Sequence, residues 1–203
     1  MSTLILIRHG QSQWNAENRF TGWVDTPLSE QGREEAHKAG RRLADRGLGV
    51  DLAFTSTLRR AIETGRIVLG ELGQGDLEQT EAWQLNERFY GALTGRNKAQ
   101  TAEEFGEEQV RIWRRSYDIP PPGGESLADT GRRALPYFHA EVLPATDRVA
   151  TVMVAAHGNS LRAIMKDLEQ ISDDDIPKLE IPTGVPIVYE ISDRAVTGKE
   201  ILD

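Results

Sequence analysis

The stretch LILIRHGQSQWN, from Leu4 to Asn15, runs four apolar residues directly into an arginine, a histidine and a glycine. A short continuous apolar run is typical of a strand that is covered on both faces of a sheet. Arginine and histidine are costly to bury without partners, so their place directly after such a strand points to a functional use.

A second apolar run ends in the same way. Val149–Ala156 (VATVMVAA) is the longest apolar stretch of the chain and predicts a central strand, and the sequence HGNS follows it. Two further strands are predicted at Asp51–Thr55 and Pro186–Ile191. The chain thus has two predicted core strands that each end in histidine and glycine.

Helical patterns fill the segments between the strands. Helices are predicted over Ser29–Arg46, from Leu58 onward, over Thr101–Tyr117, from the N-cap Ser126 onward with a kink at Pro136, and after HGNS. This alternation favours an α/β fold, a three-layer α/β/α arrangement with a mostly parallel central sheet. No repeat or shift of composition marks a boundary, so residues 1–203 are expected to form a single domain.

The composition argues against several classes of partner. The 203 residues carry a net charge of -8, whereas nucleic acid and anionic membranes both need a basic surface. The chain has no cysteine, which excludes thiolate nucleophiles and zinc–thiolate sites. It has neither an apolar run of membrane-spanning length nor the pattern of a secretion signal, so we expect a soluble cytoplasmic protein.

The two His-Gly pairs predict a ligand site, because ligands of open α/β sheets bind beyond the carboxyl ends of the strands. Either His9 or His157 alone could be a solvated loop residue, but two of the four histidines share this placement. Gly10 and Gly158 would let the backbone approach a ligand closely. The residues after Gly158 would open a helix whose N–H groups face an anion.

Metal binding is an alternative use of these histidines. A catalytic zinc site needs about three protein ligands, and neither His9 nor His157 has a second histidine or an acidic cluster beside it. Arg8 would also repel a cation at His9. The sequence therefore favours a site without metal.

Arginines favour a phosphate site instead. Arg8, the pair Arg59-Arg60 and the pair Arg114-Arg115 could form a cage, since guanidinium groups bind phosphoryl oxygens bidentately, although a pair on a helix is often only a solvated face. A neutral imidazole in such a cage can attack phosphorus while the arginines offset the charge of the transition state. Glu87, in the apolar and aromatic setting LNERFYG, is the candidate proton donor, because burial favours a protonated carboxyl.

Several segments together resemble the 2,3-bisphosphoglycerate-dependent phosphoglycerate mutases of the histidine phosphatase superfamily. RHG alone resembles only the superfamily, and the other segments are more specific. They are RHGQSQWN (Arg8–Asn15), RFTGW.D.PLSE.G (Arg19–Gly32), TS.LRRA (Thr55–Ala61), LNERFYGALTG (Leu85–Gly95), WRR (Trp113–Arg115), AAHGNSLRA (Ala155–Ala163) and IPTGVPIVYE (Ile181–Glu190).

The resemblance implies a role for each matching position. His9 matches the phosphorylated histidine, held neutral by a hydrogen bond from its other ring nitrogen to backbone, and Glu87 matches the proton donor and acceptor. His157 matches the histidine that stabilises the transferring phosphoryl group, and Arg8 and Arg60 match the arginines of the phosphate pocket. The positions that match substrate-binding residues are Ser12, Asn15, Thr21, Gly22, Arg88, Tyr90, Lys98, Arg114, Arg115, Gly158 and Asn159.

The resemblance also implies the reaction: interconversion of 3-phosphoglycerate and 2-phosphoglycerate in glycolysis and gluconeogenesis. It implies 2,3-bisphosphoglycerate as primer, no permanently bound cofactor, no metal, and a homodimer or homotetramer.

The chain departs from longer mutases in two places. It has only PPPGGES where they carry an insertion of roughly two dozen residues, and it ends soon after Ile191, where they carry a tail that closes over the site. A lid protects a phosphohistidine from water. A phosphatase of small phosphoesters is therefore the alternative enzyme, and an inactive phosphate-binding module is a third interpretation. Retention of Lys98, Arg114 and Arg115 favours the mutase.

Overall fold

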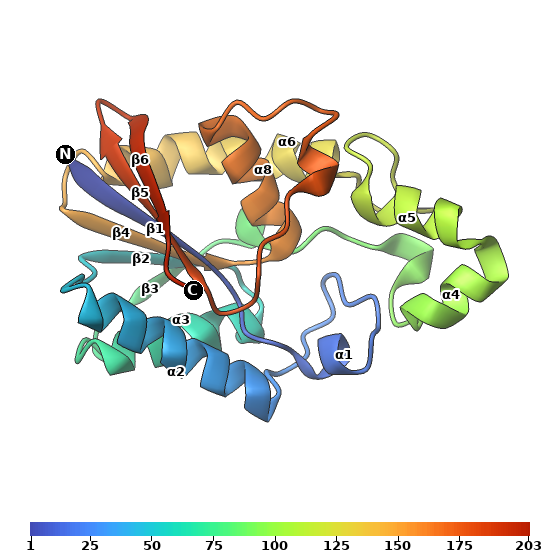
Figure 1. Ribbon diagram of the computed structural model, residues 1–203, viewed down its shortest axis with the longest axis horizontal. Helices are drawn as coiled ribbons and strands as arrows, with labels where there is room; N and C mark the ends of the chain where they lie inside the picture. Colours follow the sequence, from blue (N-terminus) through green and yellow to red (C-terminus); the bar gives the residue numbers. More distant parts are fainter.

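Six strands form one sheet in the order β3-β2-β4-β1-β5-β6, in a computed structural model that describes residues 1–203 (Figure 1). The strands are β1 (Ser2–Arg8), β2 (Leu52–Thr55), β3 (Gln79–Glu81), β4 (Thr151–Ala156), β5 (Pro186–Ser192) and β6 (Ala195–Ile201). The four strands β1 to β4 pair in parallel, whereas β5 and β6 are antiparallel. The predicted, mostly parallel sheet is confirmed.

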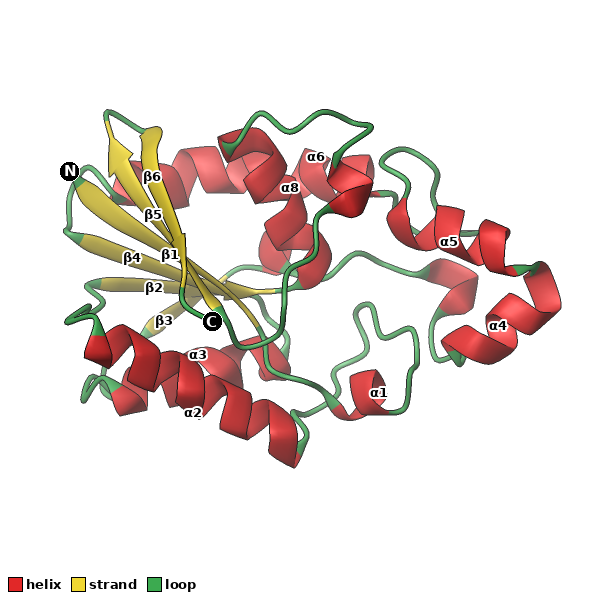
Figure 2. Cartoon of the chain, in the orientation of Figure 1, coloured by secondary structure: helices red, strands yellow, loops and turns green.

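Helices cover both faces of this sheet, which confirms the predicted three layers (Figure 2). They are α1 (Gln13–Ala16), α2 (Glu30–Asp45), α3 (Arg59–Glu71), α4 (Lys98–Phe105), α5 (Glu107–Arg115), α6 (Leu127–Tyr137), α7 (Leu143–Ala145) and α8 (Gly158–Leu168). The helices α2 and α3 lie on one face, and α6 and α8 lie on the other. Short 3-10 turns span Trp83–Leu85, Gly91–Leu93 and Ile176–Lys178.

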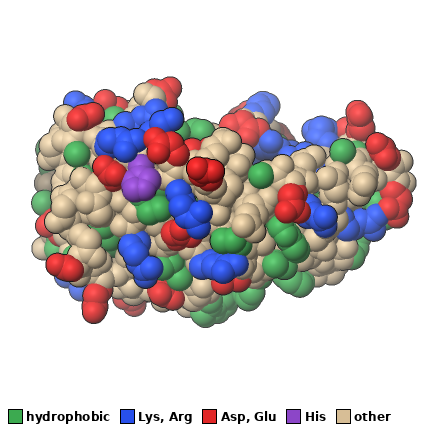
Figure 3. Space-filling view, turned by 90° about the horizontal axis from the view of Figure 1, so that it is seen from below, with side chains coloured by type: hydrophobic (Ala, Val, Ile, Leu, Met, Phe, Trp, Pro, Cys, Tyr) green, Lys and Arg blue, Asp and Glu red, His purple; other side chains and the backbone are tan.

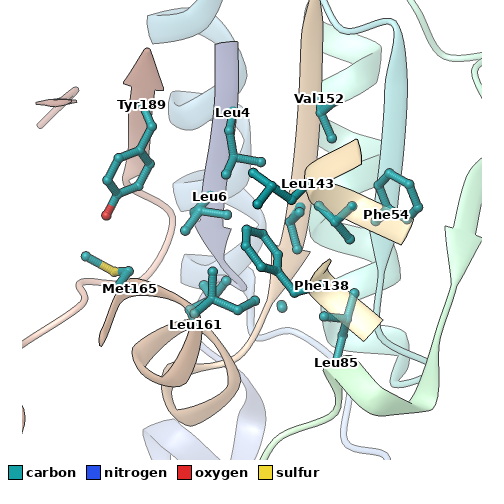
Figure 4. Close-up of a cluster of buried hydrophobic side chains, with 14 of the residues drawn as sticks. Leu4, Leu6, Phe54, Leu85, Phe138, Leu143, Val152, Leu161, Met165 and Tyr189 are labelled. Atoms are coloured by element: carbon teal, nitrogen blue, oxygen red, sulfur yellow. The ribbon is translucent and has the colours of Figure 1, made fainter. Parts of the chain in front are cut away.

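The core lies on both faces of β1, because successive side chains of a strand point to opposite sides. Leu4 and Leu6 face the larger cluster, which includes Phe138 and Leu161 from the α6 and α8 side (Figure 4). Ile5 and Ile7 pack in the second cluster, against residues of α2 and α3. The four consecutive apolar residues Leu4–Ile7 thus place β1 in the middle of the molecule, and the end of the strand fixes where His9 begins.

The expected single helix over Thr101–Tyr117 was wrong. Asn97 caps α4 with its side chain, so the helix begins at Lys98, and Gly106 with a φ of +87° separates α4 from α5. Only glycine adopts this backbone conformation readily, so Gly106 ends one helix and begins the next.

Pro136 lies inside α6, and the predicted disturbance follows it. Proline lacks the N–H of a normal helical hydrogen bond and crowds the preceding turn. The helix passes into a π-helical turn over Phe138–Val142 directly after it. The sequence patterns missed β3 and β6, which are the edge strands and are half-buried or exposed rather than apolar.

Beyond the carboxyl ends of the parallel strands, α4 and α5 form a lobe that extends away from the sheet (Figure 1). The lobe packs on a small cluster of Phe20, Leu93 and Val110. None of the helices combines the length and the apolar composition that crossing a membrane requires.

Candidate active site

One pocket of about 210 Å³ lies where β1 and β4 end and the α4–α5 lobe begins. It is lined by Arg8, His9, Asn15, Arg19, Phe20, Thr21, Gly22, Arg60, Glu87, Tyr90, Lys98, Arg114, Arg115, Gly158, Asn159, Arg162, Leu179, Glu180 and Ile181. Seven of these are lysine or arginine and two are glutamate. On the face of the molecule in Figure 3, by contrast, acidic and basic side chains are interspersed. The local basic cluster that an anion needs is therefore present in an acidic chain.

His9 follows β1 directly and is 3% exposed. Its Nδ1 lies 2.7 Å from the carbonyl oxygen of Gly10, which can only accept, so Nδ1 carries the proton. The predicted backbone hydrogen bond is present. Burial lowers the pKa of His9 well below its usual value, and Arg60 and Arg8 lower it further. The ring is thus neutral at physiological pH, with the lone pair on Nε2.

Arg60 contacts that lone pair. Its Nε donates to His9 Nε2 at 3.3 Å, while its two terminal nitrogens donate to the carbonyl oxygens of Val24 and Gly22 at 2.9 and 2.7 Å. Burial lowers the pKa of Arg60 to about 10, which still leaves it charged at neutral pH. The guanidinium is fixed in place beside the nucleophilic nitrogen.

His157 follows β4, and its ring centroid lies 4.9 Å from that of His9. Its Nε2 is 2.7 Å from Ser56 Oγ, and its buried Nδ1 has no partner. Burial lowers the pKa of His157 well below its usual value, with Arg60 adding to the shift. When Ser56 donates to Nε2, the neutral ring carries its proton on Nδ1 and has one free N–H to offer.

Glu87 is 9% exposed and lines the same pocket as His9. Its Oε1 accepts from the backbone N–H of Arg88 at 2.8 Å and from the backbone and side-chain N–H groups of Asn159 at 3.1 and 2.9 Å. Its Oε2 accepts no hydrogen bond and is free to exchange a proton. The backbone N–H of Asn159 near the start of α8 was expected to face a ligand, but it binds Glu87 instead.

Gly10 has a different role from the one expected. A Cβ at Gly10 would lie 2.0 Å from the carbonyl oxygen of Gly32, so the close approach here is between the β1 loop and α2. Gly158, by contrast, lines the pocket.

Lys98, Arg114 and Arg115 stand at the lobe end of the pocket, on α4 and α5. Burial, with Arg114 and Arg8 nearby, lowers the pKa of Lys98 to about 8. Arg115 forms a 2.5 Å ion pair with Glu180 across the pocket. These cations have the geometry to hold a second anionic group away from His9.

All but three of the predicted site residues line this pocket. His157 lies behind it against His9, and Ser12 caps α1 through Asn15. Arg88 is fully buried and donates to the carbonyl oxygens of Trp113 and Arg114 at 2.9 and 2.5 Å. It therefore holds the end of α5, where the substrate-facing arginines stand.

The sequence patterns did not indicate other lining residues, above all Arg19, Arg162 and Glu180. Arg162 lies one helical turn after Asn159, and that spacing could have indicated it. Burial lowers the pKa of Arg162 to about 10, and its buried Nε has no partner. No pattern could have indicated Glu180, which reaches the pocket from an irregular segment.

The chain holds no group of three or more histidine, aspartate or glutamate side chains arranged to bind a metal ion. The residues beside His9 and His157 are cationic, and they fit a phosphoryl group better than a metal cation.

Known proteins resemble this chain in sequence and in fold. A protein of Parvibaculum lavamentivorans named 2,3-bisphosphoglycerate-dependent phosphoglycerate mutase is 56% identical over 98% of this chain and 95% of its own. A protein of the same name from a Chelativorans species is 57% identical over 99% and 98%. The structure of a mycobacterial glucosyl-3-phosphoglycerate phosphatase superposes with a TM-score of 0.79 at 28% identity, covering 94% and 93%.

Residues 4–201 match the histidine phosphatase superfamily, branch 1. Because it is also more than half identical to these relatives over nearly their full length, the chain belongs to that superfamily and, within it, to the family of the 2,3-bisphosphoglycerate-dependent phosphoglycerate mutases.

Proposed function

We propose that the protein is a phosphoglycerate mutase that interconverts 3-phosphoglycerate and 2-phosphoglycerate through a phosphohistidine at His9, primed by 2,3-bisphosphoglycerate. The observation that carries this proposal is a pocket with a neutral, buried histidine at one end and lysine and arginine at both ends. A bisphosphorylated glycerate has anionic groups at both of its ends, and this pocket matches that charge.

The reaction begins when Nε2 of His9 attacks a phosphorus atom of 2,3-bisphosphoglycerate. The N–P bond forms as the P–O bond breaks, and Glu87 gives its proton to the departing oxygen. Arg8, Arg60 and the free N–H of His157 offset the charge on the equatorial oxygens. The monophosphoglycerate that remains can leave as product, or it can accept the phosphoryl group in the next transfer.

The return transfer runs the same chemistry in reverse. The free hydroxyl of the bound phosphoglycerate loses its proton to Glu87 and attacks the phosphohistidine, so that 2,3-bisphosphoglycerate forms again. The intermediate then reorients and returns its other phosphoryl group to His9. Lys98, Arg114 and Arg115 hold the anionic end that is not reacting, which keeps the intermediate from leaving between the two transfers.

Hydrolysis of small phosphoesters is the second candidate. No residue of the turn between α5 and α6 lines the pocket, and none after Ile181 does. The segments that correspond to the lid of longer mutases thus stand away from His9, which favours entry of water.

One assay separates the two activities. The protein is supplied with 3-phosphoglycerate and catalytic 2,3-bisphosphoglycerate, and 2-phosphoglycerate and free phosphate are followed together. The proposal expects 2-phosphoglycerate to form far faster than phosphate, with the same rates after exhaustive chelation. Phosphate release that outpaces 2-phosphoglycerate would make the protein a phosphatase, and activity restored by added metal would contradict a metal-free site.

We also propose that the protein works in the cytoplasm, where these metabolites occur, as a single domain over residues 1–203 that assembles into a homodimer or homotetramer. Size-exclusion chromatography with light scattering tests the assembly.

A further inference from the structure

An arginine behind the loop that carries Glu87 uses all five of its N–H groups. Arg133 lies on α6, and its side chain is 9% exposed. Its Nε and Nη2 donate to the two carboxylate oxygens of Glu125 at 2.9 and 2.8 Å. Its remaining N–H groups donate to the carbonyl oxygens of Gln84, Asn86 and Glu87 at 2.8, 3.0 and 2.9 Å. The guanidinium therefore joins α6 to three backbone positions of one loop.

Further hydrogen bonds hold the same loop. Glu125 accepts from the N–H of Phe89 at 3.0 Å, and the N–H of Glu125 donates to the carbonyl oxygen of Phe89 at 2.8 Å. Trp23 Nε1 donates to the carbonyl oxygen of Glu87 at 2.5 Å, and the Arg133 guanidinium lies 5.4 Å from the Trp23 ring centre. The backbone of Glu87 is thus held by Arg133 and Trp23 together.

These hydrogen bonds determine the position of one oxygen atom, Oε2 of Glu87. Glu87 Oε1 is occupied by three N–H donors, and only Oε2 is free to exchange a proton with substrate. Where Oε2 stands depends on where the backbone of Glu87 stands, and the carbonyl oxygens that fix this backbone bind Arg133. Proton transfer needs near-contact geometry, so a displacement of about 1 Å can cost about 10²-fold in rate.

We propose that Arg133, oriented by Glu125, is a positioning residue that sets Glu87 for proton transfer. The inference rests on the proposed role of Glu87 as proton donor. Arg133 touches neither the pocket nor a reacting atom, because it is absent from the pocket lining. Burial lowers the pKa of His157 and the charge of Arg133 lowers it further, so a variant that keeps the charge is needed to isolate its effect on Glu87.

Substrates with different leaving groups separate this role from a merely structural one. When His9 attacks a phosphoglycerate, the departing alkoxide needs the proton of Glu87. When it attacks p-nitrophenyl phosphate, the P–O bond breaks to a stable nitrophenolate anion that needs no proton. Loss of the positioning should therefore slow the first reaction and spare the second, whereas loss of folding slows both.

The test compares Arg133→Lys with Glu87→Gln as reference and Arg132→Lys as matched control. Lysine keeps the charge but offers three donors instead of five in a planar fork. Arg132 is the neighbouring residue on α6, pairs only with Asp129, and has a side chain that is 76% exposed. Glu125→Gln is a second variant, since it keeps the shape of the side chain and weakens its bidentate pair with Arg133.

We expect Arg133→Lys to lower kcat for phosphoglycerate conversion by about 10- to 100-fold, with KM changed by less than about threefold. The first release of nitrophenolate should change by less than about threefold in the same variant. Glu125→Gln should lower the same kcat by a smaller factor and likewise leave nitrophenolate release nearly unchanged. Arg132→Lys should match the wild type on both substrates. In the Glu87→Gln background, Arg133→Lys should add little, because both act on one step.

Three outcomes overturn this scheme or a part of it. Equal losses on both substrates in Arg133→Lys and Glu125→Gln, in proteins that circular dichroism shows to be folded, would make the arginine structural and end the inference. Equal losses on both substrates in Glu87→Gln would instead remove Glu87 from proton transfer, and with it that part of the proposed function. Wild-type rates on both substrates in both Arg133→Lys and Glu125→Gln also overturn the inference.

Discussion

The two ends of the pocket are built in different ways. The His9 end stands on β1, β4 and α3, above clusters of 19 and 11 buried apolar residues, and Arg60 is fixed there by three hydrogen bonds. The opposite end stands on α4 and α5, which pack on a cluster of 3 buried residues. Elements with few buried contacts open at lower cost than core elements.

This difference separates chemistry from substrate selection. Phosphoryl transfer needs hydrogen-bond donors that do not reorganise as charge develops. The His9 end, which we call the rigid end, supplies them. Reorientation of an intermediate inside the site requires that part of the pocket can move. The lobe is the part of the pocket that packs on the smallest hydrophobic cluster, so it is the part expected to move. Substitutions at the rigid end should therefore stop every reaction of the protein, whereas substitutions at the lobe end should slow only the conversion of phosphoglycerates.

His9→Ala is expected to give the largest effect. Without Nε2 there is no phosphoenzyme, so mutase turnover and hydrolysis of p-nitrophenyl phosphate should both fall by at least about 10⁴-fold. Incubation of the wild type with labelled 2,3-bisphosphoglycerate should place acid-labile, alkali-stable label on the His9 peptide. Label at wild-type level in His9→Ala would move the nucleophile elsewhere and remove the basis of the comparison.

Replacing both Arg114 and Arg115 with alanine should slow the mutase reaction and leave the hydrolysis of p-nitrophenyl phosphate almost unchanged. Hydrogen bonds to charged groups are strong enough that each lost arginine should lower mutase kcat/KM by about 10- to 100-fold. Hydrolysis of p-nitrophenyl phosphate, which needs only the His9 end, should change by less than about threefold. Arg111→Ala is the matched control, because Arg111 stands on the same helix and pairs with Glu108 in solvent.

Equal losses of both activities in the double variant would mean that the arginines serve the phosphate pocket at His9. The two ends would then share one task, and the separation of chemistry from selection would be wrong.

The rigid end was also the part that the sequence predicted best. Continuous apolar runs at Leu4–Ile7 and Val149–Ala156 indicated buried strands, and parallel strands bring their carboxyl ends to one edge, so His9 and His157 were expected at the same edge. They meet because β1 and β4 are neighbours in the sheet. The lobe was harder, because a single glycine, Gly106, divides what charge and periodicity present as one helix.

Side chains that reach a site from irregular backbone leave no pattern at all. Ser56, which fixes a ring nitrogen of His157, lies in a short polar segment, and Glu180 lies on a loop. Arg133 resembled any other arginine of a solvated helix face, since its five partners are backbone and carboxylate atoms from distant positions. Only the tertiary structure shows such residues.

Lys98, on α4 of the lobe, predicts a dependence of substrate binding on pH. With its pKa lowered to about 8, mainly by burial, Lys98 is charged at pH 7 and loses its charge as the pH rises through 8. Binding of an anionic phosphoglycerate should therefore weaken above pH 8, with KM rising by up to about tenfold per pH unit. Lys98→Arg should flatten this profile, because arginine keeps its charge.

The matched measurement is the pH profile of nitrophenolate release, which should lack this limb because p-nitrophenyl phosphate does not need the lobe cations. If Lys98→Arg keeps the wild-type rise of KM, the titrating group is not Lys98, and the pH dependence carries no information on the lobe.

Glu180→Gln should give the smallest effect, and in the opposite direction. Glu180 pairs with Arg115 across the pocket while its own side chain is 69% exposed, so it competes with an incoming anion for the same guanidinium. Exposed ion pairs are weak, and removing this charge should lower KM for phosphoglycerate by only about two- to fivefold, with kcat for p-nitrophenyl phosphate unchanged. Glu108→Gln, which removes a carboxylate that pairs with Arg111 on the outer side of α5, should change neither. An increase of KM in Glu180→Gln would instead mean that Glu180 orients Arg115 for substrate, and the lobe end would then be pre-built like the His9 end rather than adjustable.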